Sequence, residues 1–270
     1  MDLQIEELSY TYPAGIEALR GVSLTIQSGA RVAIVGQNGA GKTTLVRHLN
    51  GLLKPTAGRV IVGGWDTRQY TTAQFAARVG YVFQNPDDQL FLSNVNAEIQ
   101  FGPKKLGWDP DRVARHVQSA LQQVELEQFA ARHPYDLSQG QRKRVALAAV
   151  LAMDTPIVIL DEPTTGQDLP GVELIGKIVS ELSRRGKTVI TITHDMDFCA
   201  EHFERVVVMG QGQVLLDGPA PQVFSETETL AKTYVDPPQL VRLANQLKFS
   251  LLPMTVEEFV RIRYKLEKSV

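Results

Sequence analysis

One short segment constrains this chain more than any other, and it reads Gly36-Gln37-Asn38-Gly39-Ala40-Gly41-Lys42-Thr43. It matches G-x-x-x-x-G-K-[ST], the pattern of a phosphate-binding loop, at every specified position. An apolar strand is predicted directly before it, over Val32 to Val35, and a helix directly after it, which is the context that such a loop requires. We therefore expect an α/β fold of the P-loop type, in which strand, loop and helix form one phosphate-binding unit.

Each residue type in this loop has a physical reason. Glycines let the main-chain amides surround a β-phosphate, and the helix N-terminus adds a favourable dipole. Lys42 is expected to reach the β- and γ-phosphates, Thr43 to bind Mg²⁺ and Thr44 to contact the α-phosphate. A glycine-rich turn that matches by chance is the alternative, and the flanking strand and helix disfavour it. The predicted nucleotide-binding residues of this segment are Gly36, Asn38, Gly39, Ala40, Gly41, Lys42, Thr43 and Thr44.

Two carboxylates end a second apolar strand. Ile157 to Leu160 runs directly into Asp161 and Glu162, an arrangement that P-loop enzymes use near their metal ion. We expect Asp161 to bind Mg²⁺ through water and Glu162 to polarise the attacking water as general base. The alternative is a pair of solvated acids at a strand end.

Length and composition limit the class of protein. With 270 residues, 43% hydrophobic and 21% charged, the chain can form one α/β domain with a smaller appendage. The formal charge of -2 and the absence of a run of Lys or Arg argue against a nucleic-acid partner. No apolar stretch approaches the roughly 18 residues that cross a bilayer, and the first residues lack a signal-peptide pattern. We expect a cytoplasmic chain whose single cysteine, Cys199, is buried and forms no disulfide.

Hydrophobic patterning divides the chain into parts. Alternation over Leu3 to Ser9 and Gly21 to Ile26 predicts an antiparallel β layer. Continuous apolar runs predict a buried parallel sheet, with strands at Val32–Val35, Tyr81–Phe83, Ile157–Leu160, Val189–Thr193 and Val206–Met209. Helical periodicity over Asp111 to Ala130 and Ser138 to Met153 predicts an inserted helical subdomain at about residues 86–155. Prolines after Gly218 mark short helical pieces that end in Val256 to Glu267, so we predict a main domain over 1–218 and a lobe over 219–270.

A third segment indicates a function only when it is considered together with the other motifs. Leu137-Ser138-Gln139-Gly140-Gln141 has the S-x-x-Q spacing of a capping box, and alone it predicts merely a well-capped helix. Other polar residues follow the predicted strands: Gln84, Asp168 and His194. By itself His194 would be read as an ordinary packed or surface histidine.

Taken together, these segments resemble an ABC ATPase over Leu3 to about Gly218. Six motifs stand in that family's order: Gly36 to Thr43 as Walker A, Gln84 as Q-loop, Ser138 to Gln141 as signature, Asp161 and Glu162 as Walker B, Asp168 in the D-loop and His194 as switch histidine. The resemblance implies ATP and Mg²⁺ as ligands. It implies Glu162, His194, Gln84 and Lys42 as catalytic residues, and Thr43, Gln84 and Asp161 as metal ligands.

The resemblance also implies roles outside the loop. Tyr12 falls where the family stacks an aromatic ring on adenine, with Tyr10 as the rival, and either ring is otherwise a core residue. Ser138, Gly140 and Gln141 are implied to cover the γ-phosphate held by a second subunit, so that hydrolysis needs a homo- or heterodimer. Gln139 departs from the family's Leu-Ser-Gly-Gly-Gln pattern, and a position that needs a positive φ would make Gln costly.

Three further segments resemble the ATPases of energy-coupling factor transporters: Tyr81 to Phe91, Asp161 to Asp168 and Asp236 to Val241. That group takes up vitamins or cobalt and nickel ions, and its ATPases dock on a transmembrane coupling protein that holds a substrate-binding membrane protein. The resemblance implies a peripheral position on the cytoplasmic face of the cell membrane, with residues 219–270 as a dimerisation lobe. It also makes Asp87 and Asp88 candidate acceptors for arginines of the partner.

Three other classes of protein share parts of this pattern. An ABC protein that acts on DNA or ribosomes usually carries a long coiled coil or two cassettes in one chain, and neither is present in this sequence. A binding module with a dead site would lack Lys42, Glu162 or His194, and all three are present. The ATPase of a conventional ABC importer or exporter remains open.

Overall fold

An antiparallel sheet is built from the first part of the chain in this computed structural model, which describes residues 1–267. Its strand order is β2-β1-β4-β5, with β1 at Leu3–Thr11, β2 at Glu17–Ile26, β4 at Ala57–Val62 and β5 at Trp65–Asp66. β1 pairs antiparallel with both β2 and β4, and it buries Leu3, Ile5 and Leu8 on one face. The prediction of an antiparallel layer is confirmed, although β4 and β5 were not predicted.

A second sheet has the strand order β10-β9-β3-β8-β7-β6. Its strands are β3 (Arg31–Val35), β6 (Val79–Val82), β7 (Ile157–Asp161), β8 (Thr188–Ile192), β9 (Arg205–Gly210) and β10 (Gln213–Pro219). The five strands predicted from apolar runs pair in parallel, as expected. β10 is antiparallel to β9 and was missed by the sequence reading. Because the parallel strands point the same way, the loops after β3, β6, β7 and β8 meet at one edge.

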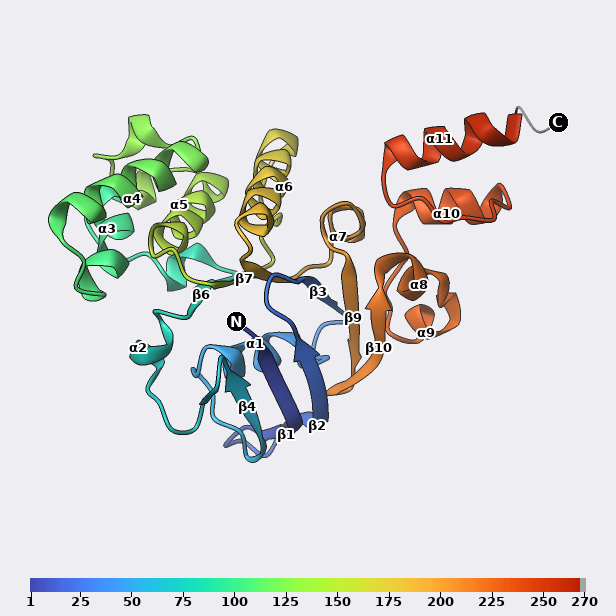
Figure 1. Ribbon diagram of the computed structural model, residues 1–270, viewed down its shortest axis with the longest axis horizontal. Helices are drawn as coiled ribbons and strands as arrows, with labels where there is room; N and C mark the ends of the chain where they lie inside the picture. The colour runs from blue at the N-terminus through green and yellow to red at the C-terminus, as the bar shows by residue number, and fades with distance from the viewer. Residues whose placement is uncertain (268–270) are drawn as a thin grey trace.

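Helices cover both faces of this sheet and form two outlying groups (Figure 1). One group follows β6 and holds most of the predicted helical insertion. The helices, in chain order, are α1 (Lys42–Leu49), α2 (Thr72–Phe75), α3 (Val95–Lys105), α4 (Pro110–Gln123), α5 (Gln139–Ala152), α6 (Leu169–Arg184), α7 (Met196–His202), α8 (Ala220–Ser225), α9 (Thr227–Lys232), α10 (Gln239–Gln246) and α11 (Val256–Glu267). Short 3₁₀ helices lie at Pro86–Asp88, Glu127–Phe129 and Pro134–Asp136.

The helix expected over Asp111 to Ala130 is shorter than predicted. α4 ends at Gln123, and Glu125 takes a left-handed φ of 56°, which stops the helix. Val124 and Leu126 are both 0% exposed and pack into the core from a turn. Their burial continues the apolar periodicity beyond the end of the helix. The expected helix at Val256 to Glu267 is confirmed with the same bounds.

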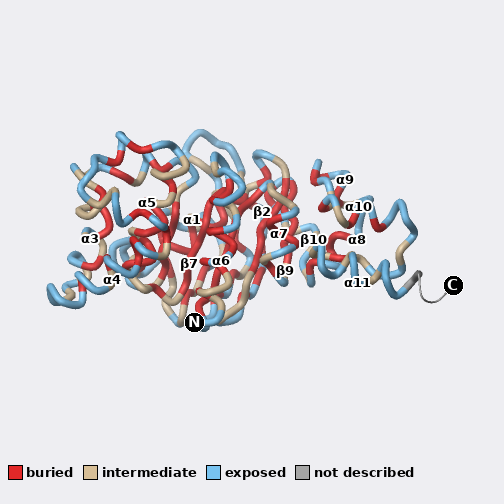
Figure 2. The backbone as a smooth tube through the Cα atoms, turned by 90° about the horizontal axis from the view of Figure 1, so that it is seen from above, coloured by how far each residue is buried: buried red, intermediate tan, exposed pale blue. Residues whose placement is uncertain are grey.

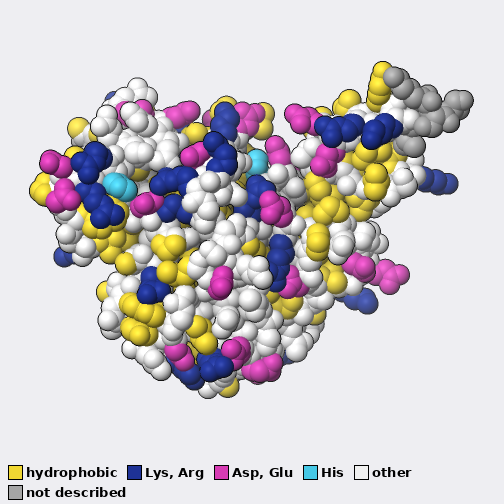
Figure 3. Space-filling view, viewed as in Figure 1, with side chains coloured by type: hydrophobic (Ala, Val, Ile, Leu, Met, Phe, Trp, Pro, Cys, Tyr) yellow, Lys and Arg dark blue, Asp and Glu magenta, His cyan; other side chains and the backbone are white. Residues whose placement is uncertain are grey.

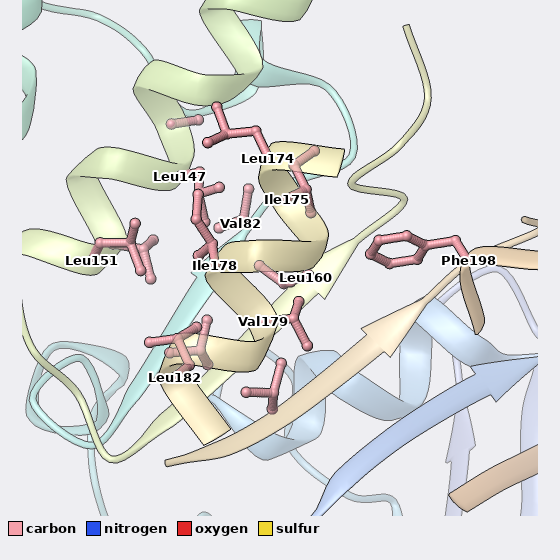
Figure 4. Packing of buried hydrophobic residues seen from close by; sticks show 14 of the residues in the cluster. Val82, Leu147, Leu151, Leu160, Leu174, Ile175, Ile178, Val179, Leu182 and Phe198 are labelled. Carbon is pink, nitrogen blue, oxygen red and sulfur yellow. The ribbon is translucent and has the colours of Figure 1, made fainter. Parts of the chain in front are cut away.

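The six-stranded sheet separates two hydrophobic cores. Its five parallel strands are buried almost throughout, whereas β10 at its edge is partly exposed (Figure 2). β3 contributes to both cores because neighbouring side chains on a strand point to opposite faces. Val32 and Ile34 face the antiparallel layer and α1, while Ala33 and Val35 face the other helices. Figure 4 shows part of the core on the face of Ala33 and Val35, to which Ile175, Val179 and Leu182 of α6 and Leu160 of β7 contribute. Because this packing fixes β7, it also fixes the positions of Asp161, its last residue, and of Glu162, which follows.

No helix within residues 1–267 is both long and apolar enough to span a bilayer. The predicted burial of Cys199 is confirmed, because it is a free cysteine with 0% exposure.

Candidate active site

A cavity of about 290 Å³ opens between the loop after β3 and the ends of β7 and β8. Twelve of the residues predicted for the site line it: Tyr12, Asn38, Gly39, Ala40, Gly41, Lys42, Thr43, Thr44, Gln84, Asp161, Glu162 and His194. Gly36, Ser138, Gly140 and Gln141 are not among its lining residues. The structure thus gathers residues from five separate segments of the sequence and leaves the signature outside.

The glycines of the loop are required by its backbone. Gly39 and Gly41 have φ values of 80° and 98°, a region that side chains with a Cβ rarely adopt. A Cβ on Gly41 would lie 2.6 Å from the Ala18 carbonyl oxygen, and one on Gly36 would lie 2.1 Å from the Met209 carbonyl oxygen. Gly36 therefore lets the loop pass closely over β9, while Gly39 and Gly41 shape the concave side.

Lys42 begins helix α1 and is 6% exposed. Its Nζ donates to the main-chain carbonyl oxygens of Gly36 at 2.6 Å and Gln37 at 2.9 Å. Burial lowers the pKa of this lysine, and the charges of Glu162 and Asp161 oppose that effect. The ammonium group is therefore held within the loop, where a polyanionic phosphate would replace the two carbonyl acceptors.

Asp161 ends β7 with one carboxylate oxygen bound and one without a partner. Tyr81 of β6 donates its hydroxyl to Asp161 Oδ2 at 2.6 Å, while the buried Oδ1 has no hydrogen-bond partner. Burial raises the pKa of Asp161, and the hydrogen bond from Tyr81 opposes that effect. Oxygen ligands from a carboxylate and hydroxyls are the type that Mg²⁺ prefers. With Thr43 in the same cavity, the residues present fit a magnesium ion.

Glu162 combines burial with an unusual backbone conformation. It is 4% exposed and has a φ of 50°, a left-handed conformation that costs a non-glycine residue on the order of 1–3 kcal/mol. Its main-chain N–H donates to the Ile192 carbonyl oxygen at 2.8 Å. Burial raises the pKa of its carboxyl group, and the charge of Asp161 adds to this. A carboxylate of raised pKa at the wall of a cavity suits a general base.

His194 follows β8 and lies against Glu162. Its main-chain N–H donates to Glu162 Oε2 at 3.3 Å, and its Nε2 lies 3.1 Å from Oε1 without hydrogen-bond geometry. Burial and the charge of Lys42 lower the pKa of the imidazole, which favours its neutral form. Gln84 follows β6, is exposed and lines the same cavity.

The two candidate aromatic residues lie in different places. Tyr12 lines the cavity, and its hydroxyl is 3.0 Å from Thr44 Oγ1. Tyr10 does not line the cavity and packs edge-on against Tyr12 and His48, with ring centroids 4.9 and 4.8 Å away. Only Tyr12 is therefore placed to meet a base.

The predicted capping box of the signature is confirmed. Ser138 is the N-cap of α5: its hydroxyl accepts from the Gln141 N–H at 3.2 Å, and its own N–H donates to Gln141 Oε1 at 3.0 Å. Gln139 is the first residue of the helix and has no positive φ, so the substitution causes no left-handed strain. Its side chain packs on Gly166 of the loop after β7.

Three contributing residues were missed in the sequence. Tyr81 holds Asp161, and Gln167 donates through Nε2 to the Gly140 carbonyl oxygen at 3.0 Å. Lys143, which is buried, donates to the main-chain carbonyl oxygens of Glu162 and Thr165. A signal for Lys143 existed: it lies three, four and seven residues before Ala146, Leu147 and Val150, so a charged residue stands on the buried stripe of α5.

The fold and this cavity define a P-loop NTPase of the ATP-binding-cassette class. A family model described as ABC transporter matches residues 19–165. The chain belongs to the ABC transporter ATP-binding proteins, in the branch of the energy-coupling factor transporter ATPases.

Named relatives support that placement. The chain is 41% identical over 262 residues to the energy-coupling factor transporter ATP-binding protein EcfA of Methanothermobacter thermautotrophicus, covering 95% of this chain and 84% of that one. It also resembles the solved structure of cbiO1 from Clostridium perfringens, part of the ABC transporter complex cbiONQ, with 36% identity, a TM-score of 0.75 and coverage of 91% and 98%.

A second similar solved structure is the ATP-binding cassette MJ0796, a dimer in a post-hydrolysis state bound to ADP and Pi. It has 30% identity, a TM-score of 0.75 and coverage of 80% of this chain and 98% of that chain. Other curated relatives at 46% identity are longer, and the chain spans only 42% and 40% of their length.

Proposed function

We propose that this chain binds and hydrolyses ATP as one subunit of a dimer, and that this hydrolysis drives uptake through an energy-coupling factor transporter. The observation that carries the proposal is the cavity that joins the phosphate-binding loop to Asp161, Glu162 and His194. Its oxygen and nitrogen groups suit a triphosphate, a metal ion and an attacking water.

In this proposal each residue has a separate task. The loop amides and Lys42 bind the β- and γ-phosphates, and the ring of Tyr12 stacks on adenine. Glu162 accepts the proton of the attacking water, and His194 holds the carboxylate and faces the γ-phosphate. Mg²⁺, held by Thr43, Asp161 and Gln84, would neutralise charge on the phosphate oxygens when bound.

The position of the signature supports a dimer. Ser138, Gly140 and Gln141 lie outside the chain's own cavity, at the N-terminus of α5, and the N-terminus of a helix favours an anion. We propose that they close over the nucleotide of a second subunit. The residue 219–270 lobe is proposed to add dimer contacts, because α10, its C-cap residue and α11 expose the apolar side chains of Leu243, Leu247, Val256 and Val260. Figure 3 shows apolar side chains among charged ones over this part of the chain.

An apolar hollow beside the Q-loop is the proposed docking site for the membrane partner. It has a volume of about 270 Å³, and Phe91 and Phe101 at its rim are 64% and 39% exposed. Asp87 and Asp88 lie in the 3₁₀ helix next to it, but Asp87 already pairs with Arg142, Oδ1 to Nε at 3.1 Å. To bind an arginine of the partner, Asp87 must therefore give up its ion pair with Arg142. Asp88 is the second carboxylate of this segment that the partner could bind.

The transported substrate is proposed to be a micronutrient, either a vitamin or a cobalt or nickel ion. Support comes from the similarity to an energy-coupling factor ATPase and to cbiO1 of a cbiONQ complex. In the complex the chain would lie on the cytoplasmic face of the cell membrane, bound to a transmembrane coupling protein and a substrate-binding membrane protein.

Affinity purification of the intact membrane complex tests the proposal. We expect ATPase activity, a second ATPase subunit, a coupling protein and a small substrate-binding membrane protein with its bound substrate. Recovery of transmembrane domains without such a substrate-binding protein would instead indicate a conventional ABC importer or exporter. A complex that hydrolyses no ATP would contradict the catalytic part of the proposal.

A further inference from the structure

Lys143 is a buried lysine to which neither the motifs nor the proposed mechanism gives a role. It lies on α5, two residues after the signature, and is 3% exposed. Its Nζ donates to the main-chain carbonyl oxygen of Glu162 at 2.5 Å and to that of Thr165 at 3.1 Å. A buried ammonium group needs such acceptors, because its desolvation is otherwise unfavourable.

Lys143 binds the main chain of Glu162, the site residue with the left-handed backbone conformation. Glu162 has a φ of 50°, and non-glycine residues persist in that region only where their surroundings hold them. On one side the Glu162 N–H is bound to the Ile192 carbonyl oxygen, and on the other side the Glu162 carbonyl oxygen is bound to Lys143. The peptide groups before and after the Glu162 Cα are thus both fixed, and the direction of the carboxylate follows from them.

Packing and charge favour a fixed position for Lys143. The space that it lines with Leu160 and Pro163 is about 10 Å³, at the lower limit for one water molecule. Burial lowers the pKa of Lys143, while the charges of Glu162 and Asp161 raise it. The ammonium group therefore lies close to two buried acids whose negative charge stabilises it. Main-chain oxygens, and not water, accept its hydrogen bonds.

We propose that Lys143 is a positioning residue for the general base, which holds Glu162 in its left-handed conformation through the main-chain carbonyl. This inference rests on the proposed function, because it presupposes that Glu162 is the base. It adds a link within one subunit: the helix that begins with the signature also sets the geometry of that subunit's own base. Gln167, which binds the Gly140 carbonyl oxygen, fastens the same loop to the same helix.

The test compares Lys143→Met with a matched control, Lys187→Met, in the full-length chain. Lys187 is also a buried lysine, 8% exposed, and its Nζ donates to the Thr155 main-chain oxygen at 2.7 Å. Thr155 precedes β7, at the end of the strand remote from the site. Lys143→Gln, which keeps a neutral donor, is measured in parallel so that a folding defect in the Met variant does not remove the test.

We expect Lys143→Met to lower kcat by up to about 100-fold, the scale of a misplaced catalytic group, with unchanged affinity for ATP. Lys143→Gln should keep part of the kcat that Lys143→Met loses. Lys187→Met should leave kcat unchanged even where it lowers thermal stability. In a Glu162→Gln background, Lys143→Met should cause no further loss of turnover and should leave the ATP-bound dimer intact.

Four results would overturn the inference: parental kcat in both Lys143 variants, an equal loss of kcat in Lys187→Met, a loss of ATP affinity that accounts for the change, or a full further loss in the Glu162→Gln background. Failure of the proposed function is distinguishable, since Glu162→Gln alone would then hydrolyse ATP like the parent.

Discussion

Replacing Glu162 with Gln separates the chemistry of the site from its architecture. Gln has nearly the same size, and its amide oxygen can accept the His194 N–H that now donates to Oε2 at 3.3 Å. The side chain loses only its ability to take a proton. General-base catalysis contributes typically about 10²–10⁴-fold, which corresponds to about 2.7–5.4 kcal/mol of activation free energy. We expect kcat to fall by that factor while ATP still binds.

The same substitution should make the folded chain more stable at neutral pH. Burial raises the pKa of Glu162, so the ionised carboxylate is disfavoured in the fold and this cost is present above the raised pKa. Gln removes the cost. As the pH falls below the ordinary value for Glu, the parent is protonated in both folded and unfolded states, and the difference between parent and variant disappears.

Two assays check the prediction. Phosphate release and nucleotide binding, measured on the same preparation, should show lost turnover with retained affinity and an accumulated ATP-bound dimer. Chemical denaturation at about pH 8 and about pH 3.5 should show extra stability only at the higher pH. Parental turnover would refute the assignment of the base, and a variant destabilised at the higher pH would refute the reasoning from burial.

Other substitutions test other parts of the site. Tyr12→Ala should weaken binding of ATP and GTP alike by about 1–3 kcal/mol, and a loss in Tyr10→Ala instead would move the stacking role to Tyr10. Gln139→Gly should raise or leave unchanged the turnover of the dimer without altering ATP affinity of the isolated subunit, and a changed affinity would contradict a role in trans. Replacing Asp87 and Asp88 together by Lys should lower complex assembly and transport, at about 2–5 kcal/mol for a broken interfacial Arg–carboxylate pair, with near-normal ATPase activity of detached subunits; normal transport would remove this segment from the docking surface.

The site was largely predictable because its main residues follow apolar strands directly. The strand before Asp161 and the loop after Val35 each give a local pattern, and parallel pairing brings their ends together. Lys143 and Tyr81 could not be assigned in this way. Their contacts with Glu162 and Asp161 span 19 and 80 residues, so they depend on how α5 and β6 pack and not on any local spacing.

The missed strands have weak local signals for identifiable reasons. β10 follows β9 through the two-residue turn Gln211-Gly212, in which both residues have positive φ values of 50° and 79°. Asn-Gly is the usual sequence for such a turn, and Gln in the first place hides it. The second residue of β4 is Gly58, which has a φ of 75° and passes so close to Glu7 that a Cβ would lie 2.2 Å from the Glu7 carbonyl oxygen. Glycine at that point looks like a strand breaker in the sequence.

The left-handed backbone at position 162 means that folding and catalysis favour different residues there. The conformation favours Gly, Asn or Asp, and none of them carries a carboxylate at the reach of Glu. In a library of all residues at this position, abundance of folded protein should rank Gly and Asn above Glu, whereas growth that depends on transport should rank Glu first. The identity of residue 162 in an evolving population would then report whether selection acted on folding or on turnover.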